Sequence, residues 1–170
     1  MRVLGIDPGT ANTGYGVVVS APGRLSALVS GVIETSSRAP LERRLADIHA
    51  RVAELIDEHE PDAVAVEDLF FGNNARSAFA VGQARGVVLL AAGQRAIPCA
   101  AYTPQQVKGA VCGSGRAGKD QVGRMVQALL RLTEMPKADH TSDALAVAVC
   151  HVNRAPLQAR LQKAADGVGT

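Results

Sequence analysis

The stretch Arg2-Val3-Leu4-Gly5-Ile6-Asp7-Pro8-Gly9-Thr10 decides how the rest of the chain is interpreted. A short apolar run ends on the carboxylate of Asp7, turns through Pro8-Gly9, and returns as a second apolar run that ends near Val19. Pro and Gly favour turns, so the pattern predicts two paired strands. Asp is common in turns, and Asp7 could simply cap the turn before Pro8-Gly9. A carboxylate that ends an apolar strand nevertheless needs a partner to offset its desolvation, and a cation would be a suitable one.

The composition predicts one soluble globular domain inside the cell. The chain has 170 residues, of which 47% are hydrophobic and 20% charged, and it can bury a core without disulfides. Its net charge of +2 means that nucleic-acid binding would depend on local basic clusters. Widely spaced Cys99, Cys112 and Cys150 argue against a zinc site and suit a reducing cytoplasm. We expect no signal peptide and no membrane span.

A second strand that ends on a carboxylate follows the first helix. Residues 25–34 predict a third strand of an antiparallel meander, and apolar residues at helical spacing predict a helix that begins at Pro40. Ala63–Glu67 then reads AVAVE. A strand that follows a helix is expected to pair in parallel with an earlier one. Pairing with the first strand would bring Asp7 and Glu67 together, where a divalent cation would relieve their repulsion.

The middle of the chain predicts an Ala- and Gly-rich helix over residues 75–92, with Asn74 as its cap. Its small residues would allow close packing in the core or against a partner subunit. A last strand over residues 97–102 and a short helix that begins at Thr103-Pro104 should follow.

Residues 113–120, GSGRAGKD, match the GxxxxGK pattern of a phosphate-binding P-loop. A P-loop needs Ser or Thr where this chain has Asp120, and it needs a preceding strand that residues 109–112 do not provide. We therefore do not interpret the segment as a P-loop. Lys119, at the start of a helix predicted over residues 121–132, could instead reach a phosphate from a mobile loop.

A final helix is predicted from Asp139 onward, and it places His140 and Asp143 on one face. Asp139 should be rotated away from them and could cap the helix. His140 could also be an ordinary surface residue, and Asp143 a favourable charge in a first helical turn. Residues 155–170 predict a flexible tail, so that the folded domain would comprise residues 1–154.

Asp7, Glu67, His140 and Asp143 form one acidic set with a single imidazole. Such donors suit Mg²⁺ or Mn²⁺ better than zinc. Two such ions about 4 Å apart are the usual arrangement for in-line phosphodiester hydrolysis. Each acid alone is weak evidence, but the ordered set points to a metal-dependent nuclease.

With these motifs, the sequence resembles the RuvC-type Holliday-junction endonucleases over nearly its whole length. The resemblance rests on five segments: residues 5–10, 14–16, 66–67, 82–86 (GQARG) and 142–146 (SDALA). It implies a ribonuclease-H-like α/β fold, with a mixed five-stranded sheet flanked by helices. It also implies symmetric nicking of two opposed strands of a four-way DNA junction during recombination and repair.

The resemblance also implies roles for individual residues. The family's catalytic acids fall on Asp7, Glu67 and Asp143, and its fourth position, which is Asp or His in relatives, falls on His140. His140 would then either ligate a metal or transfer a proton. The other positions implied are Phe70 for stacking on a base near the crossover, Lys108 and Lys119 near the scissile phosphate, and Arg76 on the DNA backbone.

The expected cofactor is Mg²⁺, with Mn²⁺ as a substitute and two ions per site. The expected partners are the junction, a second copy of the chain through residues 75–92, and the RuvA–RuvB branch-migration complex in the cytoplasm. Three alternatives are less well supported. A YqgF-type nuclease would be shorter, and an actin-like ATPase or sugar kinase would need a second domain. A DNA-binding module without catalysis would not need the four ligand-competent side chains.

Overall fold

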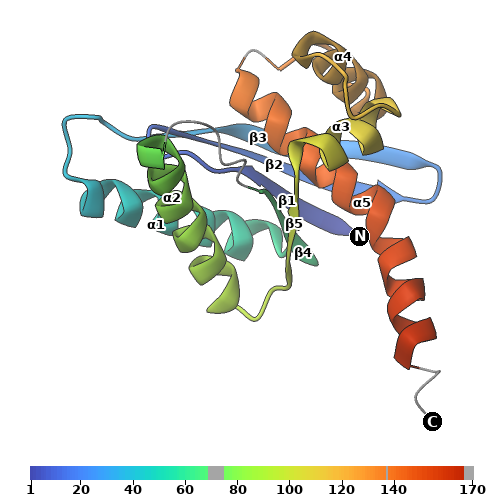
Figure 1. Ribbon diagram of the computed structural model, residues 1–170, viewed down its shortest axis with the longest axis horizontal. Coiled ribbons are helices and arrows are strands. Elements are labelled where there is room, and N and C mark those ends of the chain that lie inside the picture. The colour runs from blue at the N-terminus through green and yellow to red at the C-terminus, as the bar shows by residue number, and fades with distance from the viewer. Residues whose placement is uncertain (69–74, 137, 167–170) are drawn as a thin grey trace.

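A five-stranded mixed sheet forms the centre of the molecule, and helices cover both of its faces (Figure 1). The computed structural model describes residues 1–68, 75–136 and 138–166, without the side chains of residues 75–77 and 157–166. The strand order is β3-β2-β1-β4-β5. The strands are β1 (Arg2–Asp7), β2 (Asn12–Ala21), β3 (Arg24–Glu34), β4 (Ala63–Glu67) and β5 (Cys99–Tyr102).

The pairing of the strands confirms the predicted topology. β1, β2 and β3 form an antiparallel meander, while β4 pairs in parallel with β1 and β5 in parallel with β4. β5 begins two residues later than expected, at Cys99. The reason is that the N–H of Ile97 bonds to the carbonyl of Ala92 and Pro98 has no N–H to donate.

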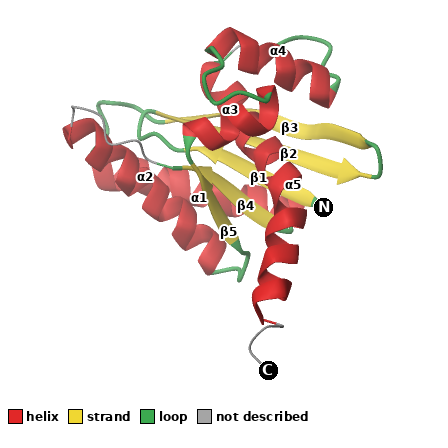
Figure 2. Cartoon of the chain, turned by 45° about the vertical axis from the view of Figure 1, so that its right-hand side comes forward, coloured by secondary structure: helices red, strands yellow, loops and turns green. Residues whose placement is uncertain are grey.

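Two hydrophobic cores lie on opposite faces of the sheet, beneath the two groups of helices that Figure 2 shows. One face is covered by α1 (Leu41–His59) and α2 (Ala75–Gly93), and the other by α3 (Pro104–Cys112), α4 (Lys119–Leu130) and α5 (Asp139–Asp166). Side chains alternate along a strand, so Leu4 and Ile6 enter the α1–α2 core while Val3 enters the α5 core. Gly5 and Asp7 therefore belong to the face that α5 covers.

Several helix ends differ from the predictions. α1 begins at Leu41, one residue after the expected start, with Pro40 as its N-cap, and α3 begins with a capping box between Thr103 and Gln106. α4 begins at Lys119, earlier than predicted, and ends at Leu130. α5 continues through Asp166 despite Pro156, well beyond the expected domain end at residue 154. Its flanking Ala, Gln and Arg residues are strong helix formers, which offsets the hydrogen bond that Pro156 removes.

Two further observations complete the comparison. Asn74, the predicted cap of α2, lies outside the described residues. Within the described part of the chain, no helix combines the length and the apolar character needed to cross a bilayer.

Candidate active site

Asp7 and Glu67 are the last residues of two adjacent parallel strands. Ile6 of β1 pairs with Val66 of β4, so the two acids occupy the next position of the same register. Glu67 follows Val66, which enters the α1–α2 core, and the alternation directs Glu67, like Asp7, to the α5 face. The sequence prediction that the two carboxylates meet at one end of the sheet is confirmed.

The start of α5 packs directly on β1 and β2 because glycines line the contact. A Cβ atom at Gly14 would lie 1.9 Å from the backbone oxygen of His140, and one at Gly5 would lie 2.1 Å from that of Ala144. A Cβ at Gly16 would lie 2.6 Å from the Leu145 side chain. Any larger residue would push the helix away from the sheet. These glycines therefore bring the first turn of α5 up to the ends of β1 and β4.

His140 reaches Asp7 from the first turn of α5. Its Nδ1 atom lies 2.6 Å from Oδ2 of Asp7, in a partly buried hydrogen bond. The Asp7 side chain is only 14% exposed, so the contact satisfies a carboxylate that has lost most of its water. The predicted shared face of His140 and Asp143 is thus directed at the sheet end that carries Asp7.

Glu67 and Asp143 are held in a site with too little positive charge. Burial, followed by the negative charges of Asp7 and Asp143 and a hydrogen bond with Asp7, raises the pKa of the Glu67 carboxyl to about 8. Burial and then the charge of Asp7 also raise the pKa of Asp143, against the opposing effect of Lys119. The site therefore favours protons or cations over three free carboxylates.

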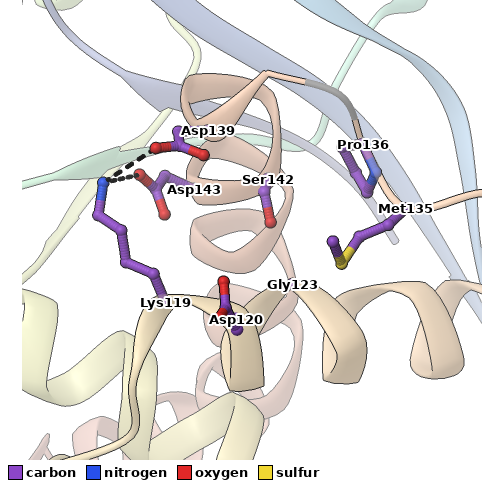
Figure 3. Close-up of a pocket in the computed structure, with 8 residues that line it drawn as sticks. All are labelled: Lys119, Asp120, Gly123, Met135, Pro136, Asp139, Ser142 and Asp143. Carbon is purple, nitrogen blue, oxygen red and sulfur yellow. Dashed lines mark ion pairs between the residues drawn. The ribbon is translucent and has the colours of Figure 1, made fainter.

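Lys119 brings positive charge to this site from the start of α4. Its Nζ atom lies 3.5 Å from Oδ2 of Asp139 and 4.0 Å from Oδ2 of Asp143 (Figure 3). These residues, with Asp120 of α4, line a small pocket of about 50 Å³ beside Asp143. The Lys119 side chain is 71% exposed, so it can move toward a ligand without leaving a buried position.

Sequence reasoning missed the role of Asp139. Asp139 lies four residues before Asp143, so the two acids share a face of the helix, and the expectation that Asp139 is rotated away from Asp143 is wrong. Asp139 forms an ion pair with Lys119, which also lies 4.0 Å from Asp143. The spacing of the two acids could have indicated their shared face, but not the contact with another helix.

The side chains of Asp7, Glu67, His140 and Asp143 are suitable ligands for a divalent cation, although their present positions do not surround one point. Among the described residues, no three acidic, His or Cys side chains are already arranged as a metal site. Asp7 faces His140 and Asp143 faces Lys119, so these acids are engaged with other groups. Asp7 and Asp143 nevertheless lie close enough to Glu67 for their negative charges to raise its pKa, and a cation could replace the proton that Glu67 then retains. Carboxylate oxygens are the ligands that Mg²⁺ and Mn²⁺ prefer.

The other predicted residues are not brought to the acids by the described structure. Lys108 is half-buried in α3, and no ion pair of the described residues joins it to an acid of the site. Phe70 lies outside the described residues. Arg76 belongs to α2, but its side chain is outside the described part.

Comparisons with known proteins agree with this architecture. The family model described as crossover junction endodeoxyribonuclease RuvC matches residues 3–151. A protein of that name from Moorella thermoacetica is 54% identical over 165 residues, covering 97% of this chain and 99% of the relative.

Two solved structures of Thermus thermophilus RuvC are also similar, each with 42% identity. The alignment with the first has a TM-score of 0.87 and covers 93% of this chain and 97% of the Thermus thermophilus chain. The second is a complex with a Holliday junction substrate. The alignment with it has a TM-score of 0.89 and covers 93% of this chain and 96% of the Thermus thermophilus chain. Together with the family match, these likenesses place the chain in the crossover junction endodeoxyribonuclease RuvC family.

Proposed function

We propose that this chain is a structure-selective endonuclease that resolves four-way DNA (Holliday) junctions by nicking two opposed strands symmetrically. It would act in recombination and repair. The observation that carries the proposal is the meeting of Asp7, Glu67 and Asp143 at one end of the sheet, in a chain of the RuvC family. Family membership over residues 3–151 also argues against the YqgF-type and actin-like alternatives.

The proposed cofactor is Mg²⁺, with Mn²⁺ as a substitute and two ions per site, held by Asp7, Glu67, His140 and Asp143. The raised pKa values of Glu67 and Asp143 support this proposal, because they reflect negative charge that a cation would neutralise. Bound there, such ions would activate the attacking water and offset the charge of the leaving 3′ oxygen.

The chain's own side chains would orient the reaction. Asp7 holds Nδ1 of His140, which leaves Nε2 as the ring nitrogen that would ligate a cation or exchange a proton. Lys119 sits beside Asp143 with an exposed ammonium, where it would bind the scissile phosphate and stabilise the negative charge that develops on it. Lys108 would add positive charge to the same DNA strand from α3.

Contacts with the junction outside the acids are proposed for Phe70 and Arg76. Phe70 follows Glu67 closely in the sequence, so it would stack on a base near the cleaved phosphate. Arg76 would contact the DNA backbone. Stacking and backbone contacts tolerate many base sequences, which suits an enzyme that selects a DNA structure.

We propose that the enzyme is a homodimer that uses the outer face of α2. The inner face of this helix buries Ala84, Val88 and Ala91. Its outer face exposes Phe79, at 70%, and Leu90, at 52%. Large exposed apolar side chains on an otherwise apolar helix favour a partner. A dimer would carry two sites for two opposed strands. The RuvA–RuvB complex and a cytoplasmic location are proposed from the family alone.

The test is cleavage of a synthetic four-way junction by the purified chain. We would compare Mg²⁺ with EDTA, and Glu67→Gln with Glu42→Gln, which changes an exposed acid on α1. Paired nicks at symmetric positions are expected with Mg²⁺ for the wild type and Glu42→Gln only. A junction that binds but stays intact with both Mg²⁺ and Mn²⁺ would instead indicate a DNA-binding module without catalysis.

A further inference from the structure

A second imidazole of α5 contacts the sheet, in the interior of the protein. Nδ1 of His151 lies 2.9 Å from the Tyr102 hydroxyl, and the two rings meet edge to face with their centroids 5.8 Å apart. Tyr102 is 1% exposed and His151 is 8% exposed, within the apolar core of the α5 face. Buried polar groups need hydrogen-bond partners, and in this core each of the two residues supplies one to the other.

Tyr102 belongs to β5, the strand next to the one that carries Glu67, and His151 belongs to α5, which carries His140 and Asp143. Tyr102 is the last residue of β5 and pairs in the strand register with Glu67. Its carbonyl also accepts a 2.8 Å hydrogen bond from the N–H of Asp68. His151 lies on α5, the helix that carries Asp143. The Tyr102–His151 hydrogen bond therefore ties the strand end beside Glu67 to the helix that presents Asp143.

His151 lies about three helical turns after His140, so the two imidazoles project from the same face of α5. His140 bonds to Asp7 at the end of β1, and His151 bonds to Tyr102 at the end of β5. Between them, α5 rests on Gly5 through Ala144 and Ala148. Small residues allow the backbones to approach but offer few interlocking side chains. Directional hydrogen bonds at both ends can therefore define the position of the helix along the sheet.

We infer that Tyr102 and His151 are positioning residues for the nuclease reaction: their hydrogen bond holds α5 where Asp143 stays beside Glu67. This inference rests on the proposed function, because it assigns the pair a role in presenting the proposed acids. Both side chains are buried, so they would act through the position of α5 and not by contact with DNA. Loss of the bond lets α5 shift, and small misplacements of catalytic groups cost large factors in rate.

The experiment compares Tyr102→Phe, His151→Leu, their double variant and His151→Asn, whose side-chain oxygen replaces Nδ1 as an acceptor. Tyr15→Phe is the matched control, since it removes a hydroxyl from the opposite core, where Tyr15 packs near Arg51 of α1. Three quantities are measured well below the melting temperature: the single-turnover rate of junction cleavage at saturating Mg²⁺, junction affinity in EDTA, and the Mn²⁺-induced rise in melting temperature without DNA.

We expect Tyr102→Phe and His151→Leu each to slow cleavage about tenfold to a hundredfold, while junction affinity stays within about twofold. The double variant should be no slower than either single variant, because both remove the same bond. His151→Asn should recover most of the rate, and Tyr15→Phe should match the wild type. The Mn²⁺-induced shift should shrink in the two single variants.

Wild-type rates and Mn²⁺ shifts in Tyr102→Phe and His151→Leu would overturn the inference, since the pair would then only fill the core. Additive losses in the double variant would overturn it as well. If the wild type itself cuts no junction with Mg²⁺ or Mn²⁺, the proposed function fails. The Mn²⁺ shift then still decides whether the pair positions the acids.

Discussion

Nδ1 of His140 lies 2.6 Å from Oδ2 of Asp7, and this contact joins the last residue of β1 to the first turn of α5. The two residues are 133 positions apart in the chain. A hydrogen bond between an imidazole and a carboxylate is stronger than one between neutral groups when the ring is charged. Asp7 thus has a partner within the protein, whereas Glu67 is left with neighbours that repel its charge.

Glu67 should make the protein less stable as the pH rises when divalent cations are absent. Its pKa is about 8 in the folded chain and 4.5 in the reference state, so the folded state binds more protons between these values. The free energy of unfolding therefore falls as the pH increases through this window and levels off above it. Glu67→Gln should flatten this dependence and be more stable than the wild type by about 1–4 kcal/mol near pH 9.

Urea unfolding in EDTA at about pH 5 and about pH 9 measures this effect. Glu42→Gln, at an exposed site on α1, should follow the wild type at both values. An equal loss of stability with pH in Glu67→Gln and in the wild type would show that Glu67 does not carry the raised pKa.

Cation binding should release protons near neutral pH. Because the pKa of Glu67 is about 8, its carboxyl is mostly protonated at pH 7 and must lose that proton to ligate a cation. The affinity for Mn²⁺ should therefore rise with pH up to about 8. Calorimetric titration in two buffers with different ionisation enthalpies counts the protons released. Release that persists unchanged in Glu67→Gln would assign the proton to another group.

Gly14→Ala should damage the site through its geometry. The new Cβ would lie 1.9 Å from the His140 backbone oxygen, so the first turn of α5 must move. We expect a loss of about 1–3 kcal/mol in unfolding free energy. Cleavage at saturating Mg²⁺ should fall further than the unfolded fraction explains, since His140 and Asp143 move with the helix.

Gly109→Ala is the matched control for this substitution, because a Cβ at Gly109 would meet nothing within 4 Å. Gly109 lies inside α3, where Ala favours the helix by about 0.5–1 kcal/mol. Denaturation and single-turnover cleavage of both variants give the comparison. Wild-type cleavage by a folded Gly14→Ala protein would show that the approach of α5 does not determine the rate.

Lys119→Met should reduce the cleavage rate by about 10²–10³, because it removes a positive charge beside the phosphate that reacts. Asp139→Asn should change the rate by less than about threefold and the stability by less than about 0.5 kcal/mol, since this ion pair is exposed. Rates are compared at saturating Mg²⁺ with junction binding measured separately. A large loss in Asp139→Asn would mean that Asp139 itself acts in the reaction.

The sheet and the identity of its terminal acids were predictable because each depends on a local pattern. Alternation along the strands and the carboxylates that end them are visible in residues 2–7 and 63–67. The parallel pairing of β4 with β1 followed from the intervening helix. The three-residue spacing placed His140 and Asp143 on one helix face, the resemblance to the RuvC-type family gave them their expected roles, and the described structure brings them to the same end of the sheet.

The contacts between distant elements were not predictable from local patterns. Tyr102 and His151 lie 49 positions apart, and nothing in the periodicity of either segment indicates that their side chains meet. The ion pair of Asp139 was not foreseen because its partner, Lys119, lies on a different helix, although the four-residue spacing from Asp143 already placed both acids on one face. The predicted flexibility of residues 155–170 stays a prediction. The backbone of this segment is helical through Asp166.

The position of α5 after all five strands in the chain has a consequence for how activity arises during synthesis. Chains fold from the N-terminus as the ribosome makes them, and contacts between distant residues form late. A nascent chain that stops before residue 139 contains Asp7 and Glu67 but neither His140 nor Asp143, and it also lacks the α5 residues that complete one core. Nuclease activity would therefore arise only after the start of α5 has been made, and products of translation interrupted before residue 139 would leave DNA uncut.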